Sequence, residues 1–592
     1  MRVIHFSSGI SIPMRRSSSR RISPGPATGD SSSRPWAGSN RLIRSIESHR
    51  STNIRRSRAA TAGSVSCSRT RILASPIGST PENTAPGSSP IAGSGPRATP
   101  HRPFAKCSCP RCGRCCPPTH PRSAKRHAGR KSANARPISH GDSELETDRA
   151  SLDRRSSKMT FWTPSERPEW VRAINAGEIA PIAEEVALPL TRTSLIEEAM
   201  ARQGGDSGSG RPSASQTLAG FDHPDFPAEP AFESLERFLA ALEEEARLSP
   251  MGRWITRRFL LRLLEVRLQL MAYLERDPGV QEEQIRAPLF VAGAPRTGTT
   301  ILHALLASDH RHRVPEGWEL LRPVPPPSPD PLEFAADARI ALADRELVLP
   351  QTVVSGLLSI HEYGGRKPKE CLSAMSFAFQ SEEFTTRYAI PSFEGWLEAS
   401  DKGAAYRMHR LVLQILQRRS AHRAWVLKSP VHLHELTTLF EIYPDARVAI
   451  THRDPLTLIA SLTSLIANLR WVHSDTVDVT SIAESQLRRY RASFDRLVDW
   501  SDEGELPTRQ IHHSHFADFR EAPIETVRAL YARFGMEWSS AAETEMRAAL
   551  VENPSNRHGE HVYSRDDLGG DPARLRRDFA RYQTRFDVPS DT

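Results

Sequence analysis

The stretch that decides the fold is Pro288-Leu-Phe-Val-Ala-Gly-Ala-Pro-Arg-Thr-Gly-Thr-Thr-Ile-Leu-His-Ala-Leu-Leu306. Its first part, 288–293, is a continuous apolar run, which is typical of a strand buried on both faces of a parallel sheet. A turn with two glycines follows, and a helix is predicted from Thr300 onward. The same succession of buried strand, polar turn and helix recurs at 424–427 and 447–451. Such repeats predict an α/β fold, a parallel sheet flanked by helices, with ligands bound at the carboxyl ends of the strands.

The turn between strand and helix nearly matches the nucleotide P-loop G-x-x-x-x-G-K-[ST]. Gly293 and Gly298 are in register, and Thr299 stands where the lysine would be. Backbone N–H groups at the start of a helix still bind an anion without that lysine. Arg296 supplies a positive charge from within the turn. We therefore expect an oxyanion site built from Arg296, Thr297, Gly298, Thr299 and Thr300.

A nucleoside-triphosphate enzyme would need more than this turn provides. Its lysine reaches the phosphates, and a nearby acid helps to hold Mg²⁺. Here the strand 447–451 leads into Arg453 rather than into an acid. The pattern indicates an anion that is handled without a metal, and we expect no metal site.

Two motifs carry a resemblance to a known family. The segment 294–300 resembles the 5′-phosphosulfate loop of sulfotransferases that use 3′-phosphoadenosine 5′-phosphosulfate (PAPS), in their bacterial P-R-T-G-T-T branch. The segment 443–461 is similar to the family's 3′-phosphate site, where an Arg at a strand end and a Ser eight residues later bind that phosphate. Arg453 and Ser461 stand at this spacing, about two helical turns apart. The resemblance runs from about Ala287 to Glu537, with weaker similarity up to Phe586. It implies a P-loop NTPase-like fold and transfer of a sulfuryl group from PAPS.

Sulfuryl transfer requires a base for the acceptor's proton and positive charge at the sulfuryl and bridging oxygens. Arg296 meets part of the second need. The resemblance implies that Lys428, at the end of strand 424–427, contacts the bridging region. The family's base histidine would stand at position 430, which is a proline here. We expect His432 and His434, which are out of register, to support other residues or to lie at the surface.

An acidic base is the expected replacement for that histidine. In the tyrosylprotein and heparan-type branches a glutamate after the first helix acts as base, and Glu316 and Glu319 lie in the matching segment. We prefer Glu319, because a Trp-Glu pair followed by Leu-Leu-Arg-Pro is typical of this branch; the alternative is an exposed glutamate at a helix start. The predicted catalytic set is thus Glu319, Lys428 and Arg296. The family's C-terminal Arg-Lys-Gly loop is missing, and Arg557–Tyr563 is a candidate for its place.

The acceptor is not identified by the sequence. The segment 323–422 is rich in aromatic residues, which either line an apolar acceptor pocket or form ordinary helical core; the core interpretation is favoured by their helical spacing. These residues are Phe377, Phe379, Phe384, Tyr388, Phe393, Trp396 and Tyr406. We expect a small-molecule acceptor with a hydroxyl or amine group, lipophilic in character.

Basic and acidic residues are unevenly distributed along the chain of 592 residues. It carries 79 Lys+Arg and 70 Asp+Glu, a net +9, and residues 1–158 hold 29 of these basic and 8 of these acidic residues. The remainder holds 79−29=50 basic and 70−8=62 acidic residues, a net −12. We predict a disordered Arg/Ser/Pro-rich segment over 1–158, a helical region over 159–285 and the sulfotransferase domain over 286–592. The first segment is also similar to an organelle transit peptide, and a third interpretation places the native start at Met159.

Within 159–285, helices are predicted at 169–175, 194–202, 234–248 and 254–275. The longest apolar stretch, Phe259 to Leu274, is interrupted by charges, so we expect no membrane insertion and a cytoplasmic protein.

Six of the seven cysteines lie in 1–158, and Cys109-x-x-Cys112-x-x-Cys115 looks like half of a zinc site without the second ligand pair.

Two other functions compete with sulfuryl transfer. One is a P-loop kinase-like nucleotide enzyme, which the missing lysine argues against. The other is a non-enzymatic protein that binds nucleic acid through the basic N-terminus. The net −12 of the remaining chain and the lack of a recognition motif argue against nucleic acid. The oligomeric state is left open.

Overall fold

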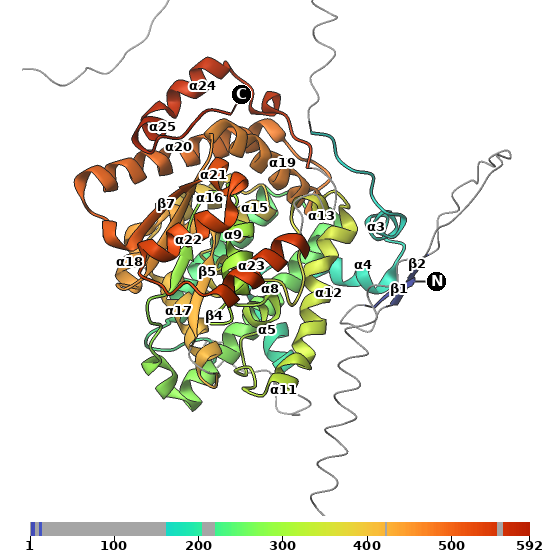
Figure 1. Ribbon diagram of the computed structural model, residues 1–592. Helices are drawn as coiled ribbons and strands as arrows, with labels where there is room; N and C mark the ends of the chain where they lie inside the picture. The colour runs from blue at the N-terminus through green and yellow to red at the C-terminus, as the bar shows by residue number, and fades with distance from the viewer. Residues whose placement is uncertain are drawn as a thin grey trace, which may run out of the picture. The chain divides into compact units, whose positions relative to one another are not determined.

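The computed structural model describes residues 2–5, 11–14, 162–203, 219–420, 423–552 and 561–591. Its centre is a five-stranded sheet with the order β4-β5-β3-β6-β7, in which every neighbouring pair is parallel (Figure 1). The strands are β3 (Leu289–Val291), β4 (His312–Arg313), β5 (Ala424–Lys428), β6 (Arg447–His452) and β7 (Ile511–His515). The prediction of a parallel sheet flanked by helices is confirmed.

The central strand β3 marks the point where the strand order reverses. Val291 of β3 lies opposite Lys428 of β5 on one side and Ala449 of β6 on the other. The chain first leaves β3 toward β4, beyond β5, and later returns to the other side through β6 and β7. In open α/β sheets, ligands bind at such a reversal, outside the carboxyl ends of the strands. The loop after β3 therefore meets Lys428 and Arg453 at one edge.

Helices cover both faces of the sheet, which explains why β3 is apolar throughout. Leu289 and Val291 pack in a buried cluster with one group of helices, whereas Phe290 points into the larger cluster on the other face. The first group is α9 (Thr299–Ser308), α22 (Pro523–Arg533) and α23 (Ser540–Glu552). The second face is covered by α17 (Gly403–Gln417), α18 (Leu436–Ile442), α19 (Pro455–His473) and α20 (Val479–Glu503).

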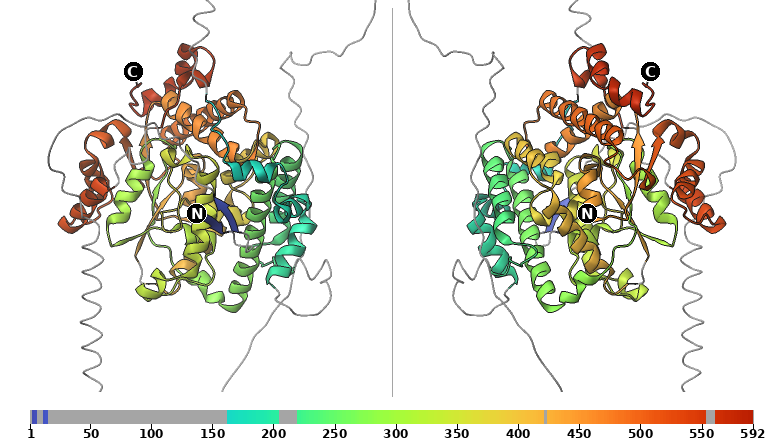
Figure 2. Two further views of the ribbon diagram at one scale, coloured as in Figure 1. Left: turned by 90° about the vertical axis from the view of Figure 1, so that its right-hand side faces the viewer. Right: turned by 90° about the vertical axis from the view of Figure 1, so that its left-hand side faces the viewer.

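The region before the sheet is helical, as the sequence predicts. Its helices are α3 (Glu169–Asn175), α4 (Ala180–Ala187), α5 (Arg192–Gln203), α7 (Ala228–Glu244) and α8 (Pro250–Arg276). Three of them, α3, α4 and α5, pack on the long helix α8 (Figure 2). Helix α8 starts four residues before the predicted point, because Ser249 caps it by accepting a hydrogen bond from Gly252 N at 3.1 Å, and Pro250 fits the first helical position.

Short helices connect β4 to β5 and complete the C-terminal part. Between those strands lie α10 (Gly317–Leu321), α11 (Pro331–Ala335), α12 (Ala338–Val353), α13 (Leu357–Ile360), α14 (Leu372–Met375), α15 (Glu382–Arg387) and α16 (Pro391–Ala399). After β7 come α21 (Phe516–Glu521), α24 (Pro572–Asp578) and α25 (Ala580–Arg585). Five short 3-10 helices, at 278–282, 376–378, 430–434, 508–510 and 565–568, complete the regular structure of these described parts.

Two strands escaped the sequence analysis. Strand β4 has only two residues, and β7 reads Ile-His-His-Ser-His, with a single apolar side chain. Both are edge strands that pair on one side only. An edge strand needs no continuous apolar run, so the periodicity rules have little to detect.

The expectation that 259–274 is the longest apolar stretch is wrong, because helix α19 is longer and more apolar. Among the described helices it alone is long and apolar enough to cross a membrane, and 83% of the relevant stretch is buried inside the fold. The most apolar long segment is therefore α19 and not 259–274. Within 1–161, the structure describes only an antiparallel pair, β1 (Arg2–His5) and β2 (Ser11–Met14). The rest of that segment, including the Cys109–Cys115 motif and Met159, lies outside the described residues.

Candidate active site

The loop after β3 is held in a fixed shape by close packing against β6. A side chain at Gly293 would place its Cβ 1.9 Å from Thr451 Oγ1, so only glycine fits there. Thr297 Oγ1 donates to Ala294 O at 2.6 Å and lies 2.5 Å from Thr451 Oγ1. Gly298 has φ of +87° and precedes the first residue of α9. The loop thus presents the N-terminus of a ten-residue helix, whose first N–H groups are free of intrahelical partners.

The predicted anion-binding residues come together beside this loop. Arg296 Nε donates to Ser461 Oγ at 3.0 Å, although 165 residues separate them. Arg453 Nη1 donates to the carbonyl oxygen of Arg296 at 2.8 Å. Arg296, Arg453 and Ser461 therefore belong to one cluster, which we call the arginine pair site. Thr297 is buried and uses its hydroxyl within the loop, so only its backbone is open to a ligand.

A histidine from the C-terminal part joins the arginine pair site. His561 Nδ1 lies 3.3 Å from both Arg296 Nη2 and Ser461 Oγ, and its Nε2 lies 3.0 Å from Ser464 Oγ. Burial, with a smaller effect of Arg296, lowers the pKa of His561 to about 4, so the ring is neutral at pH 7. Position 561 falls within 557–563, the segment considered for the place of the missing C-terminal loop; residues 557–560 lie outside the described ranges.

An aspartate near the end of the described chain sits on Arg453. Asp591 Oδ2 lies 3.4 Å from Arg453 Nε, and the guanidinium stacks over the Phe516 ring at 4.4 Å. The backbone of Asp591 is held as well, because its N–H donates to Asp454 Oδ2 at 2.9 Å and its carbonyl accepts from Arg565 Nη2 at 3.1 Å. The carboxylate of Asp591 thus lies against the guanidinium group of Arg453.

Lys428 lies at the end of β5 and is paired with a glutamate that the sequence analysis missed. Its ammonium is buried and forms an ion pair with Glu370. Burial alone would raise the pKa of Glu370, but the ion pair with Lys428 lowers it below its ordinary value. His361 itself is neutral, since burial and the nearby Lys428 lower its pKa to about 3. Nothing local in the sequence marks Glu370, which is 58 residues before its partner.

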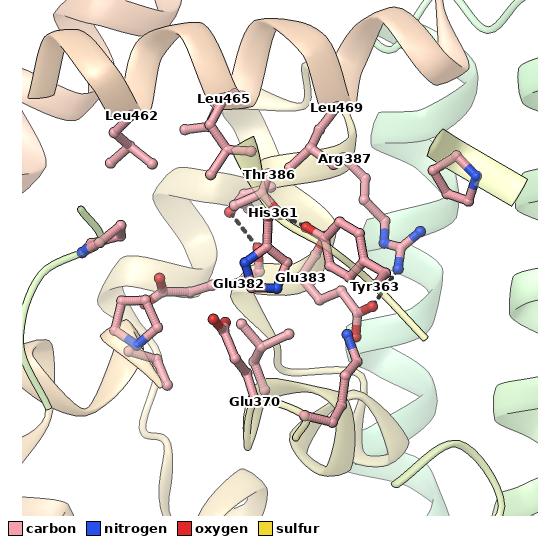
Figure 3. A pocket seen from close by; sticks show the side chains of 18 of the residues that line it. His361, Tyr363, Glu370, Glu382, Glu383, Thr386, Arg387, Leu462, Leu465 and Leu469 are labelled. Atoms are coloured by element: carbon pink, nitrogen blue, oxygen red, sulfur yellow. Dashed lines mark hydrogen bonds and ion pairs between the residues drawn. The ribbon is translucent and has the colours of Figure 1, made fainter. Parts of the chain in front are cut away.

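A cavity of about 160 Å³ opens from these residues. Pro295 of the loop and Glu370 both belong to its lining, and His361 projects into it. Figure 3 shows the opposite wall, which is formed by Leu462, Leu465 and Leu469 of α19. The cavity therefore combines one apolar wall with a carboxylate next to the phosphate-type loop. We call it the transfer cavity.

Glu319, the sequence-predicted base, lies elsewhere and is fully engaged. Only 1% of it is exposed; its Oε1 accepts from Arg313 Nη2 at 2.7 Å and its Oε2 accepts from Glu316 N at 2.9 Å. Glu316 in turn accepts from Trp318 Nε1 at 2.8 Å, and burial raises its pKa. The two glutamates form a capping box at the start of α10. Neither lines the transfer cavity.

The other sequence candidates are core residues. His432 and His434 are buried, 2.8 Å from Tyr406 Oη and 2.5 Å from Ser493 Oγ, and not at the surface. The seven aromatic residues of 323–422 pack in the large hydrophobic cluster, and none lines the transfer cavity, which agrees with the core interpretation. Among the described residues, no group of three or more side chains is arranged to hold a metal ion.

Comparison with known proteins gives one family. Residues 288–540 match the family model described as "Sulfotransferase family". A curated relative, omega-hydroxy-beta-dihydromenaquinone-9 sulfotransferase Stf3 of Mycobacterium bovis, is 25% identical over 256 residues. The match covers 42% of this chain and 63% of the relative's length, and the Stf3 of Mycobacterium tuberculosis matches equally. The matched part thus spans less than two thirds of these relatives.

Two solved structures share the fold. Sulfotransferase STF1 from Mycobacterium tuberculosis H37Rv has a TM-score of 0.56 and 26% identity, covering 66% of this chain and 98% of that one. Sulfotransferase STF9 from Mycobacterium avium has a TM-score of 0.57 and 24% identity, with 68% and 97% covered. The second similarity concerns the fold alone.

Proposed function

Because the chain belongs, over residues 288–540, to the sulfotransferase family, we propose that it transfers a sulfuryl group from PAPS to a hydroxyl or amine group of a small acceptor. The observation that carries this proposal is the arginine pair site beside the loop at the switch point of the sheet. Two guanidinium groups and a serine hydroxyl converge there from segments 157 to 165 residues apart.

The arrangement suits a nucleotide with two anionic ends. The loop amides at the start of α9, with Arg296, offer donors for a 5′-phosphosulfate. Arg453 and Ser461 offer donors for a 3′-phosphate. The ion pair of Arg453 with Asp591 supports this assignment, because a carboxylate and a phosphate both present anionic oxygens to a guanidinium group. No metal is required by this set of donors.

The reaction we propose needs one proton acceptor. The base takes the proton of the acceptor hydroxyl, whose oxygen forms a bond to sulfur while the bond from sulfur to the bridging oxygen breaks. The bridging oxygen leaves with the adenosine bisphosphate (PAP), and Lys428 balances the charge that develops there. We propose Glu370 as this base. It is ion-paired with Lys428 and lines the transfer cavity, whereas Glu319 does neither.

The Lys428–Glu370 pair also suggests how the base is activated. While the ion pair is intact, the carboxylate has a lowered pKa and is a weak base. If Lys428 turns to the oxygens of PAPS, Glu370 loses its largest stabilising charge and stays in a buried site, where burial raises its pKa. The carboxylate then becomes a stronger base at the moment when the donor is in place.

For the acceptor we propose a lipophilic small molecule. The apolar wall of the transfer cavity, from Leu462 to Leu469, supports it. The relative Stf3 acts, by its name, on an omega-hydroxylated dihydromenaquinone. That compound joins a terminal hydroxyl to a long apolar body.

The proposed donor is tested by binding. The full chain is titrated with PAP, with ATP and Mg²⁺, and with a DNA duplex by calorimetry. We expect PAP to bind, and Arg453→Ala to weaken it at least tenfold, since hydrogen bonds to a charged group contribute about 1.5–3 kcal/mol. Arg447→Ala, at the start of β6, is the matched control. Binding of ATP without PAP would refute the proposal in favour of a kinase-like enzyme, and binding of DNA alone would support a nucleic-acid protein.

A further inference from the structure

A second cavity, of about 410 Å³, lies next to the transfer cavity. One face of α8 forms one side of it and α12 forms the other, with Arg322 and α15 at the end. A volume of this size is in the range of small-molecule sites. Its lining is unusually rich in guanidinium groups, which come from Arg202, Arg258, Arg262, Arg322, Arg345 and Arg387.

The lining of this cavity has more arginines than acids. It has six arginines and four acids, Glu265, Asp344, Glu346 and Glu383, while Glu198 and Glu185, outside the lining, pair with Arg202 and Arg258. A single carboxylate, that of Glu346, serves both Arg262 and Arg322; Oε2 lies 3.0 Å from Arg262 Nε, and the other oxygen pairs with Arg322. Glu346 carries one negative charge, so it neutralises only one of these two guanidinium groups.

One buried N–H group of Arg322 has no hydrogen-bond partner among the described residues. Arg322 Nη1 is buried and forms no hydrogen bond with any described residue. A buried donor without a partner is unfavourable, and an oxyanion in the cavity would supply the missing acceptor. Burial lowers the pKa of Arg262, and the charge of the neighbouring Arg322 lowers it as well.

Aromatic rings form an apolar surface under these cations. The guanidinium of Arg258 lies over the Trp254 ring at 5.0 Å, and that of Arg387 lies over the Phe259 ring at 4.7 Å. Leu347 and Leu349 of α12 complete the apolar part. A ligand that fits this lining has an apolar body and an anionic group.

The two cavities share part of their lining. Glu346, Leu347, Pro350, Glu383 and Arg387 belong to both. The first cavity reaches Glu370 and the loop at Pro295. The two cavities are therefore neighbours, with the reactive end of an acceptor near Glu370 in one and the arginines in the other.

We propose that the second cavity binds an oxyanion, a carboxylate or a phosphate ester, carried on the apolar body of the acceptor. This inference rests on the proposed function, because it assigns the acceptor class of the same enzyme. The hydroxyl of the acceptor enters the transfer cavity, and the anionic group binds Arg258 and Arg322. The acceptor is thus an amphipathic anion and not a neutral lipid.

The test compares three probes with the same apolar chain: dodecanoate, dodecyl phosphate and dodecanol. Binding to the full chain, with and without PAP, is measured by calorimetry below the micellar concentration of each probe. We expect one or both of the anions to bind at least tenfold more tightly than the alcohol, which corresponds to about 1.4 kcal/mol. The two anionic probes show which oxyanion is preferred.

Variants of the lining arginines test whether the anion binds in this cavity. Arg258→Gln/Arg322→Gln should bring the affinity for the preferred anion to that of dodecanol and leave dodecanol binding unchanged. Arg276→Gln, an exposed arginine on the same helix α8, is the control and should behave as wild type. If the double variant fails to fold, Arg345→Glu reverses a charge at an exposed position and should weaken anion binding at least threefold.

The inference is overturned if the wild-type chain binds the preferred anion less than tenfold more tightly than dodecanol. It is also overturned if the folded double variant, or Arg345→Glu, keeps the preference of the wild type for the anion. PAP binding, measured in the same samples, keeps the two proposals apart. Absence of the anion preference in the wild type, with PAP binding intact, refutes only the acceptor class. Absence of PAP binding refutes the proposed function itself.

Discussion

Glu370 and Glu319 lie in different surroundings, which favour different roles for the two carboxylates. Glu370 is paired with Lys428 at the edge of the sheet where the loop lies, and it borders a cavity. Glu319 has both oxygens engaged, by Arg313 and by a backbone N–H, and it joins α10 to β4. The first surroundings suit proton transfer and the second suit folding stability.

The base assignment predicts a loss of transfer in Glu370→Gln. The amide keeps the size of the side chain but cannot take a proton, so kcat should fall by about 10² to 10⁴. PAP affinity should stay within about threefold of wild type, because Glu370 has no contact with Arg453 or Ser461 among the described interactions. Transfer is measured by PAP release with an alcohol acceptor. Normal turnover in this variant would exclude Glu370.

Glu319→Gln is predicted to act on stability. Its neutral amide leaves Arg313, whose side chain is 7% exposed, without an opposite charge. Breaking a buried pair in this way costs about 3–5 kcal/mol. Urea unfolding at pH 7 should show a lower midpoint, with the remaining folded enzyme still active. An unchanged midpoint with abolished transfer would return the role of base to Glu319.

At the scale of elements, the C-terminal segment 561–591 takes part in the arginine pair site. His561 contacts Arg296 and Ser461, and Asp591 contacts Arg453. Within the segment, Arg565 and Arg576 donate to the carbonyl of Asp591, and Arg565 Nη2 also donates to Thr457 Oγ1 of α19 at 2.8 Å, which holds the segment on the fold. Because this segment contacts both arginines, it would have to adjust if the proposed nucleotide binds to them.

The contact of Asp591 with Arg453 predicts competition with a 3′-phosphate. Asp591→Asn removes the competing charge and keeps the backbone contacts of the residue. PAP should bind about two- to fivefold more tightly, as expected for a partly exposed ion pair. Asp587→Asn, an exposed position in the same segment, is the control. Calorimetric titration checks both variants; weaker PAP binding in Asp591→Asn would show that Asp591 supports the nucleotide instead.

For the whole molecule, buried neutral histidines predict how stability depends on pH. Burial is the main cause that lowers the pKa of His303 and His513 to about 4 and of His409 and His473 to about 3. In the unfolded chain these rings take up a proton near pH 6.5. Between pH 6.5 and about 4 the unfolded state therefore binds more protons, and the free energy of unfolding falls as the pH falls.

The expected loss between pH 7 and pH 5 exceeds about 2 kcal/mol, the contribution of one such histidine. Urea unfolding of the full chain at pH 7, 6 and 5 measures it. His303→Gln, which keeps a donor for the carbonyl of Val426, should reduce the slope relative to wild type. A midpoint that stays constant over this range would contradict the prediction.

The sequence by itself determined the sheet type, the loop that carries Arg296, and the spacing from Arg453 to Ser461. Each of these is encoded over a few residues: apolar runs for buried strands, glycines where a turn leaves no room for a side chain, and a fixed spacing from a strand end into a helix. The tertiary structure alone decided the partners that lie far apart in the chain. Glu370 meets Lys428 across 58 residues, and His561 meets Arg296 across 265. No local pattern records such pairs, because they arise only when helices and strands pack on one another.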